Sequence, residues 1–152
     1  MVGLTIKHAL CSIVLRFRMH RIAFTADIEK TYRQVLVADE DSSYQRILWR
    51  SDRSAPLQEY QLKTVTYGMT CSPFPAVRCL LQLAHEEGER IEAANILTNH
   101  FYVDDCISGC DNAEAAINAQ QDFKKLLKKR GFSLREWCSN SADVLENITS
   151  EL

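Results

Sequence analysis

The paired aspartates at positions 104 and 105, within the stretch NHFYVDDCISG, constrain the fold of this chain more than any other feature. Mostly apolar residues lie on both sides of the pair. We therefore expect a strand over 96–103, a second strand over 106–108, and a hairpin whose tip carries Asp104 and Asp105. Two like charges a few ångströms apart repel by about 4 kcal/mol at an effective dielectric of 20. Aspartates are also common in turns, so the pair alone is weak evidence for a functional site.

The spacing of apolar residues predicts further helices and strands around this hairpin. The expected helices cover 4–20, 73–87, and the stretch from Asp111 or Asn112 to Gly131. The expected strands cover 21–27, 44–49, 58–66 and 132–137. Ser72 is expected to be the N-cap of the second helix, because Pro73 follows it directly, and Gly88 is expected to end that helix.

With residues 33–71 set aside, the predicted order is strand, helix, strand, strand, helix, strand. This order is typical of an α+β, ferredoxin-like fold with an antiparallel sheet and two helices on one face. The first and third strands are central neighbours in that fold, so Asp27 would lie beside Asp104 and Asp105. Three carboxylates at one place call for cations, and oxygen ligands suit Mg²⁺ or Mn²⁺. Two such ions about 3.5–4 Å apart can activate a 3′-hydroxyl and hold a leaving pyrophosphate.

Composition and charge narrow the class of protein. The chain has 152 residues, of which 46% are hydrophobic and 25% charged, as in an ordinary globular domain. Its formal net charge of −2 does not mark a nucleic-acid binder, and its basic clusters at 16–21 and 124–130 are more often solvated surface. The six cysteines are expected to be free thiols in a reducing compartment. No apolar run is long enough to cross a membrane, so we expect a cytoplasmic or nuclear protein.

Three stretches resemble the palm of a reverse transcriptase and occur in that family's order. FYVDD (101–105) resembles its Tyr-x-Asp-Asp box, and ADIEKTY (26–32) resembles its first aspartate motif, with an aromatic residue five positions after the Asp. YGMTCSPF (67–74) resembles the loop and helix start that contact the incoming nucleotide and the template. The stretches LRFRMHRIAFTADIEK and GFSLREWCSN further resemble Bel-Pao long-terminal-repeat retrotransposons, a metazoan group.

The resemblance implies RNA-directed DNA synthesis by nucleotidyl transfer with two Mg²⁺ or Mn²⁺ ions. Asp27 and Asp104 would bind both metals, and Asp105 would complete the catalytic site. Because neighbouring strand residues point to opposite faces, Asp104 and Asp105 can converge only if the turn redirects one of them.

The resemblance also implies a nucleotide-binding set. Tyr32 would lie under the deoxyribose and exclude a ribose 2′-hydroxyl, or alternatively it is an ordinary packing aromatic. Gly68 would let the backbone approach the substrate, or alternatively it is an ordinary turn glycine. Tyr67 and Tyr102 would lie beside the nucleotide, although retroviral relatives carry glutamine where this chain has Tyr67.

The implied partners are an RNA or DNA template with its primer, deoxynucleoside triphosphates, and further polyprotein segments such as thumb, ribonuclease H and integrase. We expect one reverse transcriptase domain fragment, with partial fingers over 1–20 and 33–71, a palm over 21–32 and 72–141, and a C-terminal tail over 142–152. Strands 44–49 and 58–66 would form a hairpin insertion of the fingers. Two alternatives remain: a non-catalytic truncated remnant, and a host-adopted module that binds nucleic acid or protein.

Overall fold

The computed structural model describes residues 6, 8–87 and 91–150 of the chain. Within these residues a four-stranded antiparallel sheet has the order β4-β5-β1-β6. The strands are β1 (Ile22–Ile28), β4 (Phe101–Tyr102), β5 (Asp105–Cys110) and β6 (Leu134–Ser139). The mixed α+β fold with an antiparallel sheet is as predicted, and the expected first and third strands, β1 and β5, are its central neighbours.

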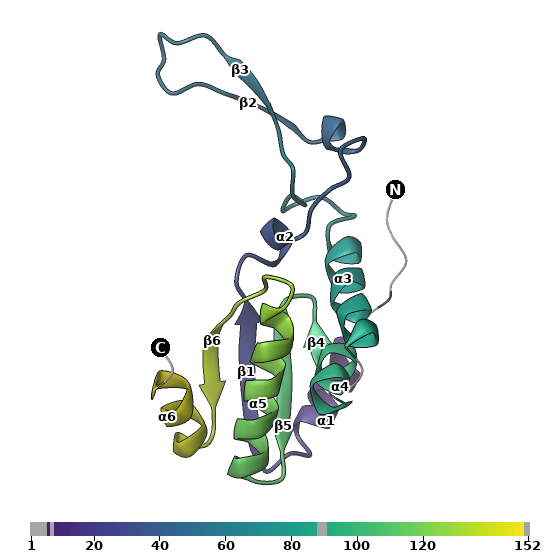
Figure 1. Cartoon of the computed structure of the whole chain (residues 1–152), viewed down its shortest axis with the longest axis vertical. Helices are drawn as coiled ribbons and strands as arrows, with labels where there is room; N and C mark the ends of the chain where they lie inside the picture. Colours follow the sequence, from purple (N-terminus) through teal and green to yellow (C-terminus); the bar gives the residue numbers. More distant parts are fainter. Residues whose placement is uncertain (1–5, 7, 88–90, 151–152) are drawn as a thin grey trace.

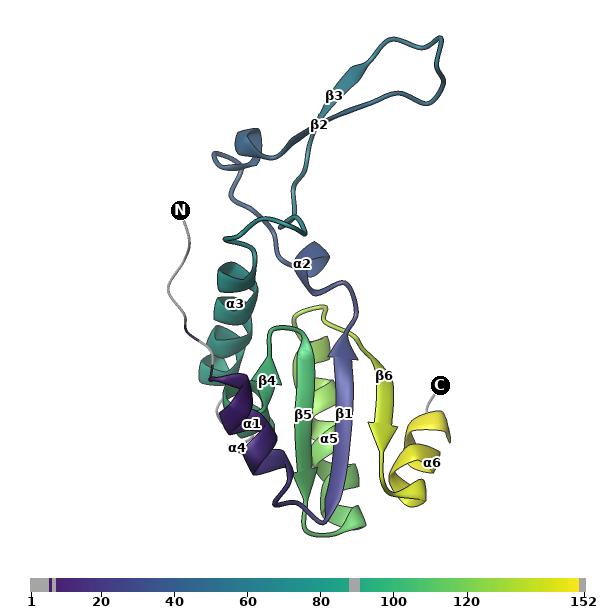
Figure 2. The same ribbon diagram turned by 180° about the vertical axis from the view of Figure 1, so that it is seen from behind.

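Helices α4 (Ile91–Asn99) and α5 (Ala113–Lys128) contact each other and the sheet. Both lie in front of the sheet in Figure 1 and behind it in Figure 2, so they cover the same face. Along β1 every second residue is buried, namely Phe24, Ala26 and Ile28, and these side chains form one core with Phe123 of α5. The alternate residues, including Asp27, therefore face away from this core.

The ends of the helices follow the sequence signals only in part. Asn112 caps α5 as predicted, because its side-chain oxygen accepts a hydrogen bond from the Ala115 N–H at 2.9 Å. Gly131, at φ +80°, follows the end of that helix. Helix α3 (Pro73–Glu86) begins after Ser72, but the Ser72 hydroxyl donates to the Thr66 carbonyl oxygen instead of capping the helix. Gly88 lies outside the described residues.

Several predicted elements were wrong in extent or type. Of the strand expected over 58–66, only Gln58–Gln61 forms a strand. The strand expected over 96–103 is mostly the end of helix α4, and strand β4 keeps only Phe101–Tyr102. Ala93, Ile96 and Leu97 are buried at helical spacing. The apolar run in this stretch is too short to distinguish the helical period from the strand period. The helix expected over 4–20 is shorter in its described part, where α1 covers Leu10–Phe17. The expected tail contains helix α6 (Ala142–Ser150), which packs on β6.

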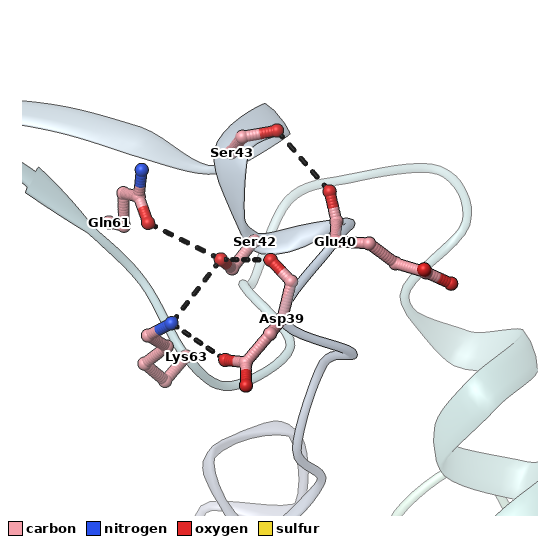
Figure 3. A network of polar contacts seen from close by, with 6 residues as sticks. All are labelled: Asp39, Glu40, Ser42, Ser43, Gln61 and Lys63. Carbon is pink, nitrogen blue, oxygen red and sulfur yellow. Dashed lines mark hydrogen bonds and ion pairs between the residues drawn. The ribbon is translucent and has the colours of Figure 1, made fainter.

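A second sheet projects from the body of the molecule (Figure 1). Strands β2 (Arg46–Trp49) and β3 (Gln58–Gln61) form this antiparallel β2–β3 ribbon, in which every residue is exposed. At its base Ser42, only 1% exposed, donates to the Asp39 carbonyl oxygen at 2.8 Å. Lys63 pairs with the Asp39 carboxylate at 2.8 Å and also reaches Ser42 (Figure 3). Short helices α2 (Thr31–Gln34) and η1 (Ser42–Tyr44) lie between β1 and the ribbon.

Two further expectations concern the whole chain. All six cysteines are free, as predicted. In the part of the chain that the structure describes, we find no helix with the length and apolar character needed to cross a membrane.

Candidate metal centre

Strands β1 and β5 bring the three predicted aspartates together. In the register of this pair Asp27 lies opposite Asp105, and Asp104 directly precedes β5. One carboxylate oxygen from each of Asp27, Asp104 and Asp105 lies within 4.8 Å of the other two. The prediction that Asp27 lies beside the paired aspartates is therefore confirmed, and we call these three residues the carboxylate cluster.

The turn between β4 and β5 explains how two adjacent aspartates can converge. Its two connecting residues are Val103 and Asp104, because Tyr102 already pairs with Asp105. The predicted hairpin tip is thus displaced by one residue, and Asp105 belongs to the strand. Val103 adopts φ +62°, which is strained for a β-branched residue. The Asp104 carbonyl oxygen accepts from the Ile28 N–H at 3.0 Å, which fixes this turn against the end of β1.

Burial and mutual repulsion act on the cluster in the same direction. Burial is the main reason that the pKa of Asp104 is raised, and the Asp27 charge adds to this effect, while a backbone hydrogen bond and Arg135 oppose it. The pKa of Asp105 is also raised, first by burial and then by the charges of Asp104, Asp27 and Glu136. The cluster therefore holds protons more tightly than isolated aspartates do, and a divalent cation would relieve the repulsion.

Arg135 is part of this site and was not predicted. Its Nε donates to Asp27 Oδ2 at 2.8 Å across the β1–β6 pair. A cleft of about 320 Å³ beside it is lined by Asp27, Asp105 and Glu136 together with uncharged residues of β1 and β5. The predicted fold could have indicated that the last strand borders the first, but not which of its residues faces Asp27.

The donor set fits a hard cation. The cluster offers carboxylate oxygens, which Mg²⁺ and Mn²⁺ prefer. Cys106 follows Asp105 directly, but it is completely buried on the core side, and this burial raises the pKa of its thiol far above the usual range. A neutral, buried thiol is not a metal ligand, so the neighbouring sulfur does not change the hard character of the site.

Tyr32 and Tyr67 meet beside the cluster. Their ring centroids are 4.7 Å apart in an edge-to-face arrangement. Burial raises the pKa of Tyr32, and the charge of Asp104 adds to the effect, so the phenol lies within electrostatic reach of the cluster. Tyr32 also packs against the core, so the packing interpretation of this residue is correct for part of its ring.

The positions of Gly68 and Tyr102 do not by themselves indicate a nucleotide-binding role. Gly68 has φ +84°, and none of the described atoms lies within 4 Å of the position a Cβ would take. Its backbone conformation is therefore sufficient reason for glycine, as in the turn interpretation. Tyr102 is half-buried and pairs with Asp105 in the β4–β5 register, so it lies on the strand that leads into the cluster.

An antiparallel α+β sheet that gathers three carboxylates at the end of its central strands is typical of polymerases that use metal ions. Residues 5–137 match the family model described as reverse transcriptase (RNA-dependent DNA polymerase), so the chain belongs to the reverse transcriptase family. Membership implies a nucleic-acid template and deoxynucleoside triphosphates as substrates. A comparison with curated proteins found no match.

Proposed function

We propose that this chain is the palm and partial fingers of an RNA-directed DNA polymerase, in which Asp27, Asp104 and Asp105 hold two Mg²⁺ or Mn²⁺ ions. The convergence of the three carboxylates within 4.8 Å supports this proposal most directly. When bound, the two ions would supply charge neutralisation for the triphosphate and activation of the primer 3′-hydroxyl. We further propose, from its sequence motifs, that the polymerase is of the Bel-Pao type and works with further polyprotein segments.

The protein side chains divide the remaining tasks among them. Asp27 and Asp105 face each other across the β1–β5 pair, and Asp104 approaches from the turn, so the cluster is rigidly oriented before substrate arrives. Tyr32 would lie under the deoxyribose, with Tyr67 packed edge-to-face against its ring. An aromatic ring at that place would exclude a ribose 2′-hydroxyl by steric contact.

A second observation bears on how firmly this chain holds nucleic acid. In the basic stretch 124–130, Lys129 pairs with Glu87 and Arg130 pairs with Glu86 at 2.8 Å. Lys125 lies 3.8 Å from Asp122. These cations are partly neutralised by neighbouring acids, which favours weak, salt-sensitive contact with phosphates. We therefore propose that the chain alone has low polymerase activity. The remnant alternative differs in predicting no activity at all.

Primer extension on an RNA template with Mn²⁺ at low salt tests the proposal. We expect weak extension by the unmodified chain and none by Asp27→Asn. Asp143→Asn is the matched control, because Asp143 lies in α6, away from the turn that carries the cluster (Figure 1). Equal extension by Asp27→Asn would overturn the assignment of the cluster, and complete absence of extension in the unmodified chain would favour the remnant alternative.

A further inference from the structure

We propose that Arg135 is a positioning residue that occupies Asp27 in the metal-free site and is displaced when a divalent cation binds. This inference rests on the proposed function, because it assigns a regulatory partner to the same carboxylate cluster. The observation behind it is the direct contact between Arg135 Nε and Asp27 Oδ2 at 2.8 Å.

A β-bulge places this arginine opposite Asp27. Thr25 pairs with Cys138, but Asp27 pairs with Arg135, so one residue of β1, Ala26, faces two residues of β6. Without the extra residue the register that pairs Thr25 with Cys138 would place Glu136 directly opposite Asp27. The bulge instead places the Arg135 guanidinium opposite Asp27, while Glu136 still lines the cleft beside Asp27 and Asp105. Bulges commonly redirect a side chain next to a functional site.

The bulge also brings an unfavourable backbone conformation. Glu136 adopts φ +52°, a conformation that residues other than glycine seldom take. The flanking structure holds the bulge in place, since the Glu29 N–H donates to the Ser133 carbonyl oxygen at 2.8 Å and the Trp137 ring packs 6.0 Å from that of Phe24. Strained backbone conformations cluster at functional sites, so the strain at Glu136 supports a functional role for this register.

Charge and exposure suggest how the contact opens. The Asp27 side chain is 17% exposed and fixed in the sheet, whereas that of Arg135 is 47% exposed and has solvent available. A divalent ion on Asp27 would repel the guanidinium at close range. Glu136 Oε1 already lies 3.7 Å from Arg135 Nε, so the arginine has a second carboxylate to which it can move.

The consequence is a competition between guanidinium and metal. Before metal binds, Arg135 supplies one positive charge to a cluster of three carboxylates and keeps Asp27 in place. Metal must displace that charge, so the affinity of the unmodified protein for metal is lower than the carboxylates alone would give. We expect removal of the guanidinium to strengthen Mn²⁺ binding about tenfold, which corresponds to about 1.4 kcal/mol.

Titration of the full chain with Mn²⁺, followed by the paramagnetic resonance signal of the free ion, tests this expectation. The chain is compared with Arg135→Gln, with Arg135→Lys, which keeps the charge, and with Asp27→Asn. Arg46→Gln is the matched control, since Arg46 pairs with Glu59 at 2.6 Å on the distant β2–β3 ribbon. We expect tighter binding in Arg135→Gln alone, affinity close to the unmodified value in Arg135→Lys and Arg46→Gln, and loss of binding in Asp27→Asn.

The possible failures are distinguishable. Equal or weaker Mn²⁺ binding in Arg135→Gln than in the unmodified chain would overturn the competition and leave the metal site standing. No binding in any variant would overturn the metal site and the competition with it. Should Arg135→Gln not fold, the unmodified protein still decides the matter. The Arg135 Nε–H proton should exchange slowly without metal and faster with Mg²⁺, and an unchanged exchange rate in saturated protein would refute the proposal.

Discussion

The carboxylate cluster and the β2–β3 ribbon are both built on antiparallel strands, but different forces hold them. The strands under the cluster are fixed by a buried face, with Phe24 and Phe123 completely enclosed in one core. The ribbon has no buried face, and Leu48, for example, is 67% exposed. Its order comes from strand pairing, from the edge-to-face contact of Trp49 with Tyr60, and from polar contacts at its base.

This difference separates positioning from adaptability. Carboxylates that share metal ions must stay within about half an ångström of their productive positions. A packed core on the opposite face of the sheet provides that rigidity. An exposed ribbon with few buried contacts belongs to the low-stability end of a structure and can change orientation at small cost. The following predictions test whether the two regions are as independent as this contrast implies.

The largest expected effect comes from removing core support under the cluster. Phe24→Ala should lower the free energy of unfolding by about 3–5 kcal/mol, because it removes a fully buried ring and leaves a cavity. Leu48→Ala on the ribbon should change it by less than about 0.5 kcal/mol. Urea denaturation measures both, and a comparable loss for Leu48→Ala would show that the ribbon carries global stability.

The stabilisation that metal binding provides should depend on the cluster and not on the ribbon. At a free Mn²⁺ concentration 100-fold above the dissociation constant, mass action adds about 2.7 kcal/mol to the stability of the folded state. Asp104→Asn should greatly reduce this gain, whereas Asp39→Asn at the base of the ribbon should retain it. Melting temperatures with and without Mn²⁺ provide the measurement, and an undiminished gain in Asp104→Asn would place the ions elsewhere.

The sequence predicted the parts of the site that depend on periodicity and topology. Alternation along 21–27 indicated which face carries Asp27, and the order of elements indicated that β1 and β5 are neighbours. It could not predict Arg135, because a single inserted residue decides whether Arg135 or Glu136 faces Asp27, and that insertion is fixed by packing of both strands. Helix α4 was missed because a short apolar run that includes Ile96 and Leu97 fits both the helical and the strand period.

Acidification should affect the two regions with opposite sign. The pKa values of Asp104 and Asp105 are raised in the folded state, first by burial and then by neighbouring negative charges. Both effects oppose folding at neutral pH and are relieved as pH falls through the raised values. The pKa of Asp39 is lowered by its hydrogen bond to Lys63, so its contribution is present above the usual value and is lost as pH falls through the lowered one.

Carboxyl ¹³C shifts measured against pH resolve these groups individually. Such resolution is necessary because burial lowers the pKa of His100 to about 4, and its contribution to stability is therefore lost between pH ~6.5 and about 4 in the same experiment. We expect Asp104 and Asp105 to titrate above the usual aspartate value and Asp39 below it. A common midpoint for all three would mean that cluster and ribbon base share one electrostatic environment.

The smallest effect on the whole molecule is expected at the base of the ribbon. Ser42 is buried at the centre of the polar network in Figure 3, where its hydroxyl donates to the Asp39 carbonyl oxygen and contacts Gln61 and Lys63. Ser42→Ala should cost about 1 kcal/mol locally, the usual value of one hydrogen bond. Amide hydrogens of β2 and β3 should then exchange several-fold faster, while those of β1 and β5 stay protected. Ser43→Ala is the matched control, because Ser43 is less buried than Ser42 and its hydroxyl makes a 3.4 Å contact with the Glu40 carbonyl oxygen. Faster exchange in β1 and β5 of Ser42→Ala would show that the ribbon and the cluster open together, and the contrast between the two regions would fail.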